Sequence, residues 1–255
     1  EGDKDRRDAK GTEADVRNAY NDFWWDRSTK VVPTHRTSLI VEPADGRLPF
    51  TPEGQKAQTL SKERYGKGPY DSYLDLDTGE RCLTDGLTIN YSGYNNNYQI
   101  IQAPGYVVIM AEMFRDRRII PIDGRPHGQI PQWSGDARGR WEGDTLVVET
   151  TRLADKGDYF WQDAWRAARS TTRVVERFRR VDASTIDYSY TFEDPAVFTR
   201  PWTANFPLTS DQQSRGVTAG TLYEYACHEG NYGLPGVLAG ARVQERAATG
   251  KRGSN

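Results

Sequence analysis

Residues 171–194 read TTRVVERFRRVDASTIDYSYTFED, and their pattern is that of two paired strands. Two runs rich in β-branched and aromatic side chains flank the turn-forming residues DAST. In the first run Val174, Glu176, Phe178 and Arg180 follow the alternation of a half-buried strand. The stretch therefore predicts an antiparallel hairpin.

Further strands are predicted on both sides of this hairpin. Residues 97–123 predict a three-strand meander, with NYQIIQ, YVVIMAEM and RIIPID as its strands. Residues 139–153 predict a second hairpin, and residues 200–209 and 221–229 predict two more strands. Short turns link most of these strands. The pattern favours a single antiparallel β-barrel of the calycin or lipocalin kind, because closure removes exposed strand edges. A β-sandwich is the alternative.

The chain is expected to form one domain over residues 1–255. An N-terminal helix is predicted within residues 1–30, where apolar side chains recur at helical spacing. An irregular arm, broken by Pro and Gly, covers residues 31–94 and wraps over the barrel. The barrel covers residues 95–235, and a tail covers residues 236–255.

Two short helices are expected outside the strands. One runs from Pro52 to Arg64, within the arm. The other lies within residues 155–170, DKGDYFWQDAWRAARS, whose aromatic side chains either pack on the body or cap one barrel mouth.

The composition restricts the partners of the protein. Thirty-four Lys and Arg nearly balance thirty-six Asp and Glu, so nucleic acid is not an expected partner. No apolar run approaches the roughly 20 residues that cross a bilayer, so we expect a soluble protein without membrane insertion. The mean hydropathy is low, at −0.80, yet seven Trp and fourteen Tyr predict an aromatic-rich core.

The stretch PIDGRPHGQIPQW, residues 121–133, is the first candidate site. Asp123, Arg125 and His127 occupy alternate positions and point the same way if the backbone is extended. A carboxylate could then orient the imidazole while the guanidinium holds a substrate oxygen. The alternative is a rigid turn in which Asp123 bonds Arg125 or backbone amides.

The stretch YEYACHEGNYG, residues 223–233, is the second candidate site. His228 is the better candidate for a general acid or base, with Glu229 as its partner if Gly230 bends the chain. A structural ion pair is the alternative role for Glu229. Cys82 and Cys227 are the only cysteines and form either a disulfide or two buried thiols.

Aromatic and amide side chains near these stretches are candidates for substrate binding, because they can stack on a ligand or hydrogen-bond to it. Together with Arg125, the candidates are Asn97, Tyr98, Trp133, Tyr225 and Tyr232.

No cofactor and no metal is expected. The chain lacks the glycine-rich loops of nucleotide-binding folds and the G-x-S-x-G elbow of serine hydrolases. It also lacks closely spaced pairs of histidine ligands.

The motifs YNNNYQI, RIIPIDGRPH, GRWEGDTLVVET and YEYACHEGNYG resemble those of a family of predicted secreted bacterial proteins of unassigned function. The similarity covers most of the chain from Arg36 to Arg242. It implies an exported protein, periplasmic or secreted, whose signal peptide has been removed.

Two functions follow from these sites. The first is a metal-independent lyase, isomerase or hydrolase that acts on a small organic or glycosidic substrate through His127 and His228 at the barrel mouth. The alternative is a lipocalin-like carrier that binds a small molecule without catalysis. The first function requires the two histidines to share one cavity.

Overall fold

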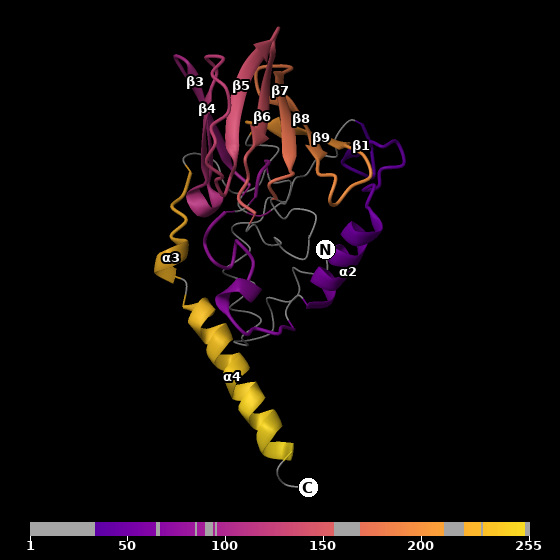
Figure 1. Ribbon diagram of the computed structural model, residues 1–255. Coiled ribbons are helices and arrows are strands. Elements are labelled where there is room, and N and C mark those ends of the chain that lie inside the picture. Colours follow the sequence, from indigo (N-terminus) through magenta and orange to yellow (C-terminus); the bar gives the residue numbers. More distant parts are fainter. Residues whose placement is uncertain are drawn as a thin grey trace.

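The computed structural model describes residues 34–64, 67–84, 86–89, 94, 96–155, 169–211, 222–230 and 232–252 (Figure 1). The described chain is mainly β and contains two antiparallel sheets. The helices predicted within residues 1–30 and 155–170 fall in whole or in large part outside the described residues.

The larger sheet has six strands in the order β1-β9-β8-β7-β6-β5. The hairpin predicted at residues 171–194 is confirmed as β7 and β8, which pair from Arg173 opposite Glu193 to Arg180 opposite Ile186. The strands predicted at residues 139–153 and 200–209 are confirmed as well. The strands of this sheet are β1 (Ile40–Glu42), β5 (Asp136–Glu142), β6 (Thr145–Thr151), β7 (Arg173–Arg180), β8 (Thr185–Glu193) and β9 (Trp202–Thr209).

The smaller sheet is the predicted meander, formed by β2 (Tyr98–Ala103), β3 (Tyr106–Ala111) and β4 (Arg117–Pro121). Gly105 closes the turn between β2 and β3 at a positive φ of 77°, a conformation that glycine adopts without strain. On β3 the side chains alternate between partly exposed and buried positions, so that Val107, Ile109 and Ala111 face the interior.

The two sheets meet at β4 and β5, which lie side by side (Figure 1) but share no ladder of hydrogen bonds. The described strands therefore do not form the predicted closed barrel, and their arrangement is closer to the alternative, a sandwich. β5 approaches the side chains of β4 closely at Gly139. A Cβ at this position would lie 2.9 Å from the Ile120 side chain and 2.8 Å from the Ile122 side chain, so only glycine fits without a shift of these neighbours.

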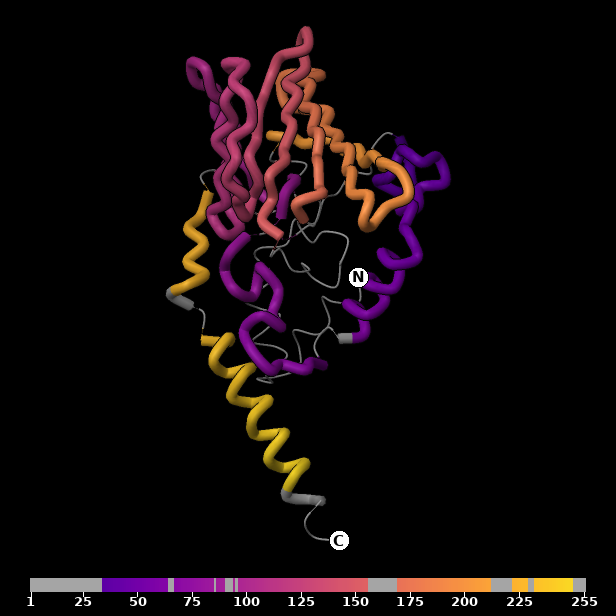
Figure 2. The backbone as a smooth tube through the Cα atoms, viewed as in Figure 1, coloured from indigo at the N-terminus to yellow at the C-terminus, as the bar shows by residue number. Residues whose placement is uncertain are grey.

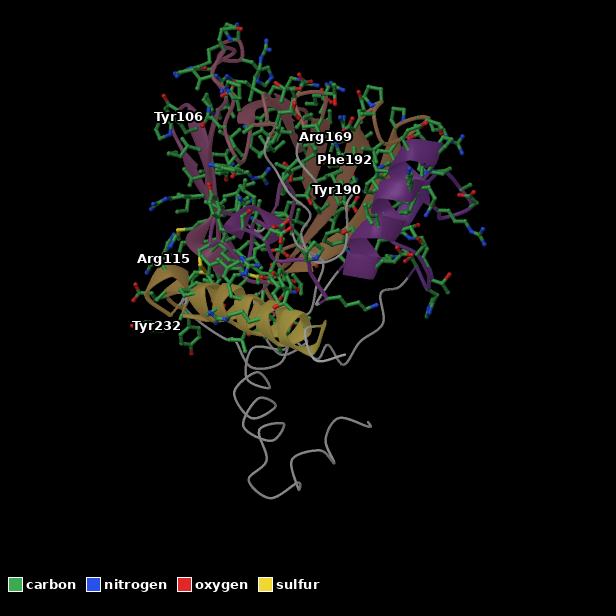
Figure 3. All side chains as sticks on the ribbon, turned by 60° about the horizontal axis from the view of Figure 1, so that its bottom comes forward. Tyr106, Arg115, Arg169, Tyr190, Phe192 and Tyr232 are labelled. Atoms are coloured by element: carbon green, nitrogen blue, oxygen red, sulfur yellow. A yellow bond between two sulfur atoms is a disulfide. The ribbon has the colours of Figure 1, made fainter. Side chains whose placement is uncertain are left out.

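Both sheets enclose one hydrophobic core, and its largest side chains are aromatic, as expected. Trp202 is 1% exposed and stacks on Phe192 with 5.7 Å between ring centroids. Tyr188 is fully buried and contacts the rings of Phe178 and Phe206. Figure 3 shows Phe192 and its neighbour on β8, Tyr190, inside the molecule.

The arm contains more regular structure than its Pro and Gly content suggests. The predicted helix is confirmed as α2 (Pro52–Arg64), and a 3-10 helix, η2, follows at Tyr73–Asp75. Figure 2 shows residues 67–89 passing below the lower ends of the strands. Another 3-10 helix, η3 (Met113–Arg115), connects β3 and β4.

The strand predicted at residues 221–229 is wrong in its described part. Residues 222–226 are irregular, and the short helix α3 spans Cys227–Gly230. Contacts with other elements replace a strand ladder here: Glu112 accepts a hydrogen bond from the Tyr223 amide, and Cys227 is bonded to Cys82.

A long helix, α4 (Gly233–Arg252), covers most of the predicted tail and extends away from the sheets (Figure 1). Arg242 anchors it by donating to the carbonyls of Tyr70 and Asp71. None of the helices in the described ranges combines the length and the apolar character needed to cross a membrane.

The junction of the sheets gives a first prediction. Gly139→Ala should lower the free energy of unfolding by about 1–3 kcal/mol, because the added methyl group overpacks the contact with Ile120 and Ile122. Urea unfolding measures the loss. Gly240→Ala is the matched control, since a Cβ at this position in α4 meets nothing within 4 Å and alanine favours a helix. Equal stability of the two variants would contradict the close approach.

Candidate functional site

The imidazole of His127 lies between two carboxylates on neighbouring strands. Its Nδ1 is 3.0 Å from Asp136 Oδ2, and its Nε2 is 3.4 Å from Glu149 Oε1. Asp136 begins β5 and Glu149 lies in β6, so the sheet fixes both partners. The His127 side chain is 23% exposed, which leaves part of the ring accessible to solvent.

Asp136 also holds the loop that carries His127. Its Oδ2 accepts a hydrogen bond of 2.9 Å from the Gly128 amide, and its Oδ1 accepts one of 2.6 Å from Arg138. Arg138 in turn donates to the carbonyl of Pro126 at 3.0 Å. The residues on both sides of His127 are thus tied to the start of β5, which restricts the orientation of the ring.

Both carboxylates are ionised at neutral pH. Burial raises the pKa of Asp136, but hydrogen bonds from Gly128 and neighbouring side chains outweigh burial and hold the pKa below its ordinary value of 3.8. Burial also raises the pKa of Glu149, and the nearby Arg173 and His127 bring it below 4.5. An ionised carboxylate only accepts hydrogen bonds, so His127 is the donor to Asp136.

Charged side chains extend this site across the larger sheet. Arg173 on β7 bonds Glu149 on one side and Glu193, on β8, on the other. The chain of ion pairs therefore crosses β6, β7 and β8 and holds the Glu149 carboxylate in place beside His127.

Asp123 and Arg125 form the rigid turn that was the alternative interpretation. Arg125 Nε is 2.9 Å from Asp123 Oδ1, and the Arg125 amide donates to the same oxygen at 3.2 Å. Arg125 also donates to the Tyr106 hydroxyl at 3.1 Å. The alternate spacing of Asp123, Arg125 and His127 predicted that Asp123 orients the imidazole. This prediction is wrong, because the carboxylate that contacts His127 Nδ1 belongs to Asp136.

The second stretch lies against η3. The rings of Tyr225 and Phe114 are 4.9 Å apart, and Arg115 forms an ion pair of 3.2 Å with Glu224. His228 follows in α3 and is exposed. The side chain of Glu229 lies outside the described residues.

The disulfide between Cys82 and Cys227 is confirmed. It joins the arm to α3, and its two cysteines are 145 residues apart in the sequence. Cys227 directly precedes His228. Cys82 has a positive φ of 56°, which is an uncommon backbone conformation for a residue other than glycine.

Asn97 is buried, at 7% exposure, and its amide lies 3.4 Å from the carboxylate of Glu112. Glu112 is 2% exposed and accepts the Tyr223 amide at 3.0 Å. Asn97 therefore has a partner in the interior and helps to anchor the segment that leads to α3.

The remaining binding candidates are dispersed. Tyr98 begins β2 and lines a hollow between the sheets and the arm. Trp133 is 36% exposed on the loop before β5. Tyr232 is 82% exposed and points away from the body of the protein (Figure 3). Among the described residues, no hydrogen bond or ion pair joins His127 to His228.

A buried charged network is the feature that sequence reasoning missed. Arg118 of β4 forms a two-pronged ion pair with Glu176 of β7, which is fully buried, and Tyr188 donates to Glu176 at 2.7 Å. Burial would lower the pKa of Arg118, but Glu176 outweighs it and raises this pKa. The signal was present in the sequence, since Glu176 sits between Val174 and Phe178 on the inward face of a strand.

No protein-family model, no curated protein and no solved structure matches this chain. Across the described ranges, no cluster of three or more His, Cys, Asp or Glu side chains is placed to hold a metal ion.

The depressed pKa values give a prediction about acid stability. Ionised Asp136 and Glu149 contribute stability that is present above their ordinary pKa values of 3.8 and 4.5 and is lost as the pH falls through the lower folded values. The free energy of unfolding in urea should therefore fall as the solution is acidified below about pH 4.5. In the Asp136→Asn variant this acid-dependent loss should be smaller.

Asp155→Asn is the control, because Asp155 is exposed on the surface. This variant should keep the acid dependence of the original protein. An Asp136→Asn variant with the full acid dependence would show that the carboxylate does not stabilise the fold through its ionised form.

Proposed function

We propose that the protein is an enzyme that uses His127 for general acid and base catalysis on a small organic or glycosidic substrate. The observation that supports this proposal is the position of the partly exposed imidazole between Asp136 and Glu149. A side chain that transfers protons near neutral pH needs a fixed orientation and access to the substrate. His127 meets both conditions.

The two carboxylates give the ring a defined role. Both ring nitrogens of His127 face ionised carboxylates, and only a doubly protonated ring donates to both. In the proposed mechanism, His127 gives its Nε2 proton to the substrate while Asp136 keeps the ring oriented through Nδ1. A water molecule then returns a proton to Nε2, and the ionised Glu149 carboxylate stabilises the doubly protonated ring.

The proposal depends on His127 alone. His228 is expected to act with it, but it lies in α3, beside the disulfide, and within the described residues no hydrogen bond or ion pair links it to His127. A role for His228 in the same reaction therefore remains a prediction, as does the assignment to a lyase, isomerase or hydrolase.

We also propose that the protein is exported to the periplasm or secreted. The Cys82–Cys227 disulfide supports this location, because disulfides persist in oxidising compartments. The resemblance to predicted secreted proteins supports the same location.

The test is a screen of the purified protein against small glycosides and phenolic or terpenoid compounds, followed by variants at the site. His127→Gln should lower kcat by about a hundredfold or more, because proton transfer by a positioned side chain contributes rate factors of this size. Asp136→Asn should also lower kcat, because the ring loses its orienting acceptor.

His35→Gln is the matched control, since His35 lies on the exposed arm. It should leave kcat unchanged. Full turnover by the His127→Gln variant would reject His127 as the proton donor. Binding of a compound without turnover, and without an effect of His127→Gln on chemistry, would favour the alternative of a lipocalin-like carrier.

A further inference from the structure

The strand β2 is an open edge of the smaller sheet, which lies at one side of the molecule (Figure 1). β3 pairs with one side of β2, and on the other side residues 99–103 form no backbone hydrogen bond within the described chain. Gln99 and residues 101–103 are exposed to solvent. Every second residue of an antiparallel edge strand directs its N–H and C=O away from the sheet, so β2 offers these groups to another strand.

The sequence of β2 carries none of the features that commonly protect an edge. Such features are charged side chains, Pro, bulges and short length. Residues 98–103 read YQIIQA, without charge or Pro, and they pair with β3 in one continuous register. The larger sheet differs, because its edge strand β1 has three residues and a break in register, and β5 at its other edge carries Arg138, Arg140 and Glu142.

An apolar row on the outer face of the smaller sheet leads to this open edge. Ile101 of β2 lies opposite Val108 of β3, and Val108 lies opposite Ile119 of β4. Ile101 is 41% exposed and Ile119 is 63% exposed. Side chains opposite each other on one face of a sheet contact each other, so the three residues form a strip that ends at Ile101. A strand paired with β2 would continue this strip.

The edge is complementary to itself. When a two-fold axis perpendicular to the sheet relates two copies of β2, the strands pair antiparallel and opposite side chains lie on the same face. With the axis at Ile101, the two Ile101 side chains meet, and Gln99 lies opposite Ala103 of the second copy. No like charges oppose each other, and the apolar row of one copy continues into that of the other. An axis at Ile100 would instead place Ile101 opposite Gln99.

We propose that two copies of this protein pair through residues 99–103 of β2, antiparallel and about a two-fold axis at Ile101, so that their smaller sheets join into one continuous sheet. The paired segment is short and buries less surface than a permanent dimer does, so we expect a reversible dimer with a micromolar dissociation constant. This interface is separate from the proposed catalysis, because His127 contacts Asp136 and Glu149 of the larger sheet.

The first test measures the oligomeric state of the full chain by analytical ultracentrifugation as a function of protein concentration. The original protein should change from monomer to dimer across the micromolar range. Ile101→Lys should raise the dissociation constant about tenfold or more, because it places two like charges opposite each other at the axis.

Ile119→Lys is the matched control. It makes the same change in the same apolar row, but on β4, two strands away from the edge. This variant should dimerise like the original protein. If Ile119→Lys weakened the dimer as much as Ile101→Lys, the outer faces of the two sheets would be stacked on each other, and pairing through the edge would be rejected.

A mixture of two variants tests the position of the axis. Ile101→Lys and Ile101→Glu should each weaken the dimer, because each opposes like charges. An equimolar mixture of the two should form a heterodimer about tenfold or more tightly than either variant alone, since opposite charges then meet at the axis. Unfolding of the variants could not produce this recovery.

Hydrogen exchange locates the contact directly. Amides within residues 99–103 should exchange more slowly as the protein concentration rises, and those of Ile101→Lys should not. The proposal is rejected if the original protein stays monomeric across the range, if Ile101→Lys dimerises normally, or if the mixed variants show no recovery. His127→Gln should dimerise like the original protein, which separates this result from the outcome of the catalytic test.

Discussion

The ion pair between Arg118 and Glu176 is the interaction on which the arrangement of the two sheets depends. Arg118 belongs to β4 of the smaller sheet and Glu176 to β7 of the larger sheet. Arg118 also donates to the carbonyl of Leu87, and the hydroxyl of Tyr188 accepts from the amide of Ile89 while donating to Glu176. One buried network therefore joins both sheets and the arm. Because Glu176 is fully buried, the loss of either charged partner would leave a charge in the core without compensation.

A buried ion pair is an expensive way to join two sheets. Desolvation offsets much of the attraction, and an apolar pair of similar size often stabilises a protein equally well. The geometry suggests what the charged pair adds here. Glu176 holds the Arg118 guanidinium in one orientation through two hydrogen bonds, and Arg118 lines the hollow between β3 and the arm. The same contact that fixes β4 against the larger sheet therefore also fixes the position of a side chain that lines this hollow.

The elements that could be predicted from the sequence are those governed by local periodicity. The hairpin at residues 171–194 alternates because one face of each strand packs into the core, and the structure has the same alternation. Alternation wrongly predicted a strand at residues 221–229. In the described part of this segment a disulfide and a hydrogen bond to Glu112 hold the chain in place of a strand ladder. His127 was identified from its chemistry, but its partner Asp136 was not, because a loop brings them together. Glu176 could have been found as a charge on an apolar strand face.

The central claim is that the Arg118–Glu176 pair couples the two sheets energetically. A double-mutant cycle with Arg118→Met, Glu176→Gln and the double variant, followed by urea unfolding, tests it most directly. We predict that each single substitution lowers the free energy of unfolding by about 3–5 kcal/mol and that the double variant loses clearly less than the sum of the two. Strictly additive losses, or single losses within about 0.5 kcal/mol of zero, would contradict the account.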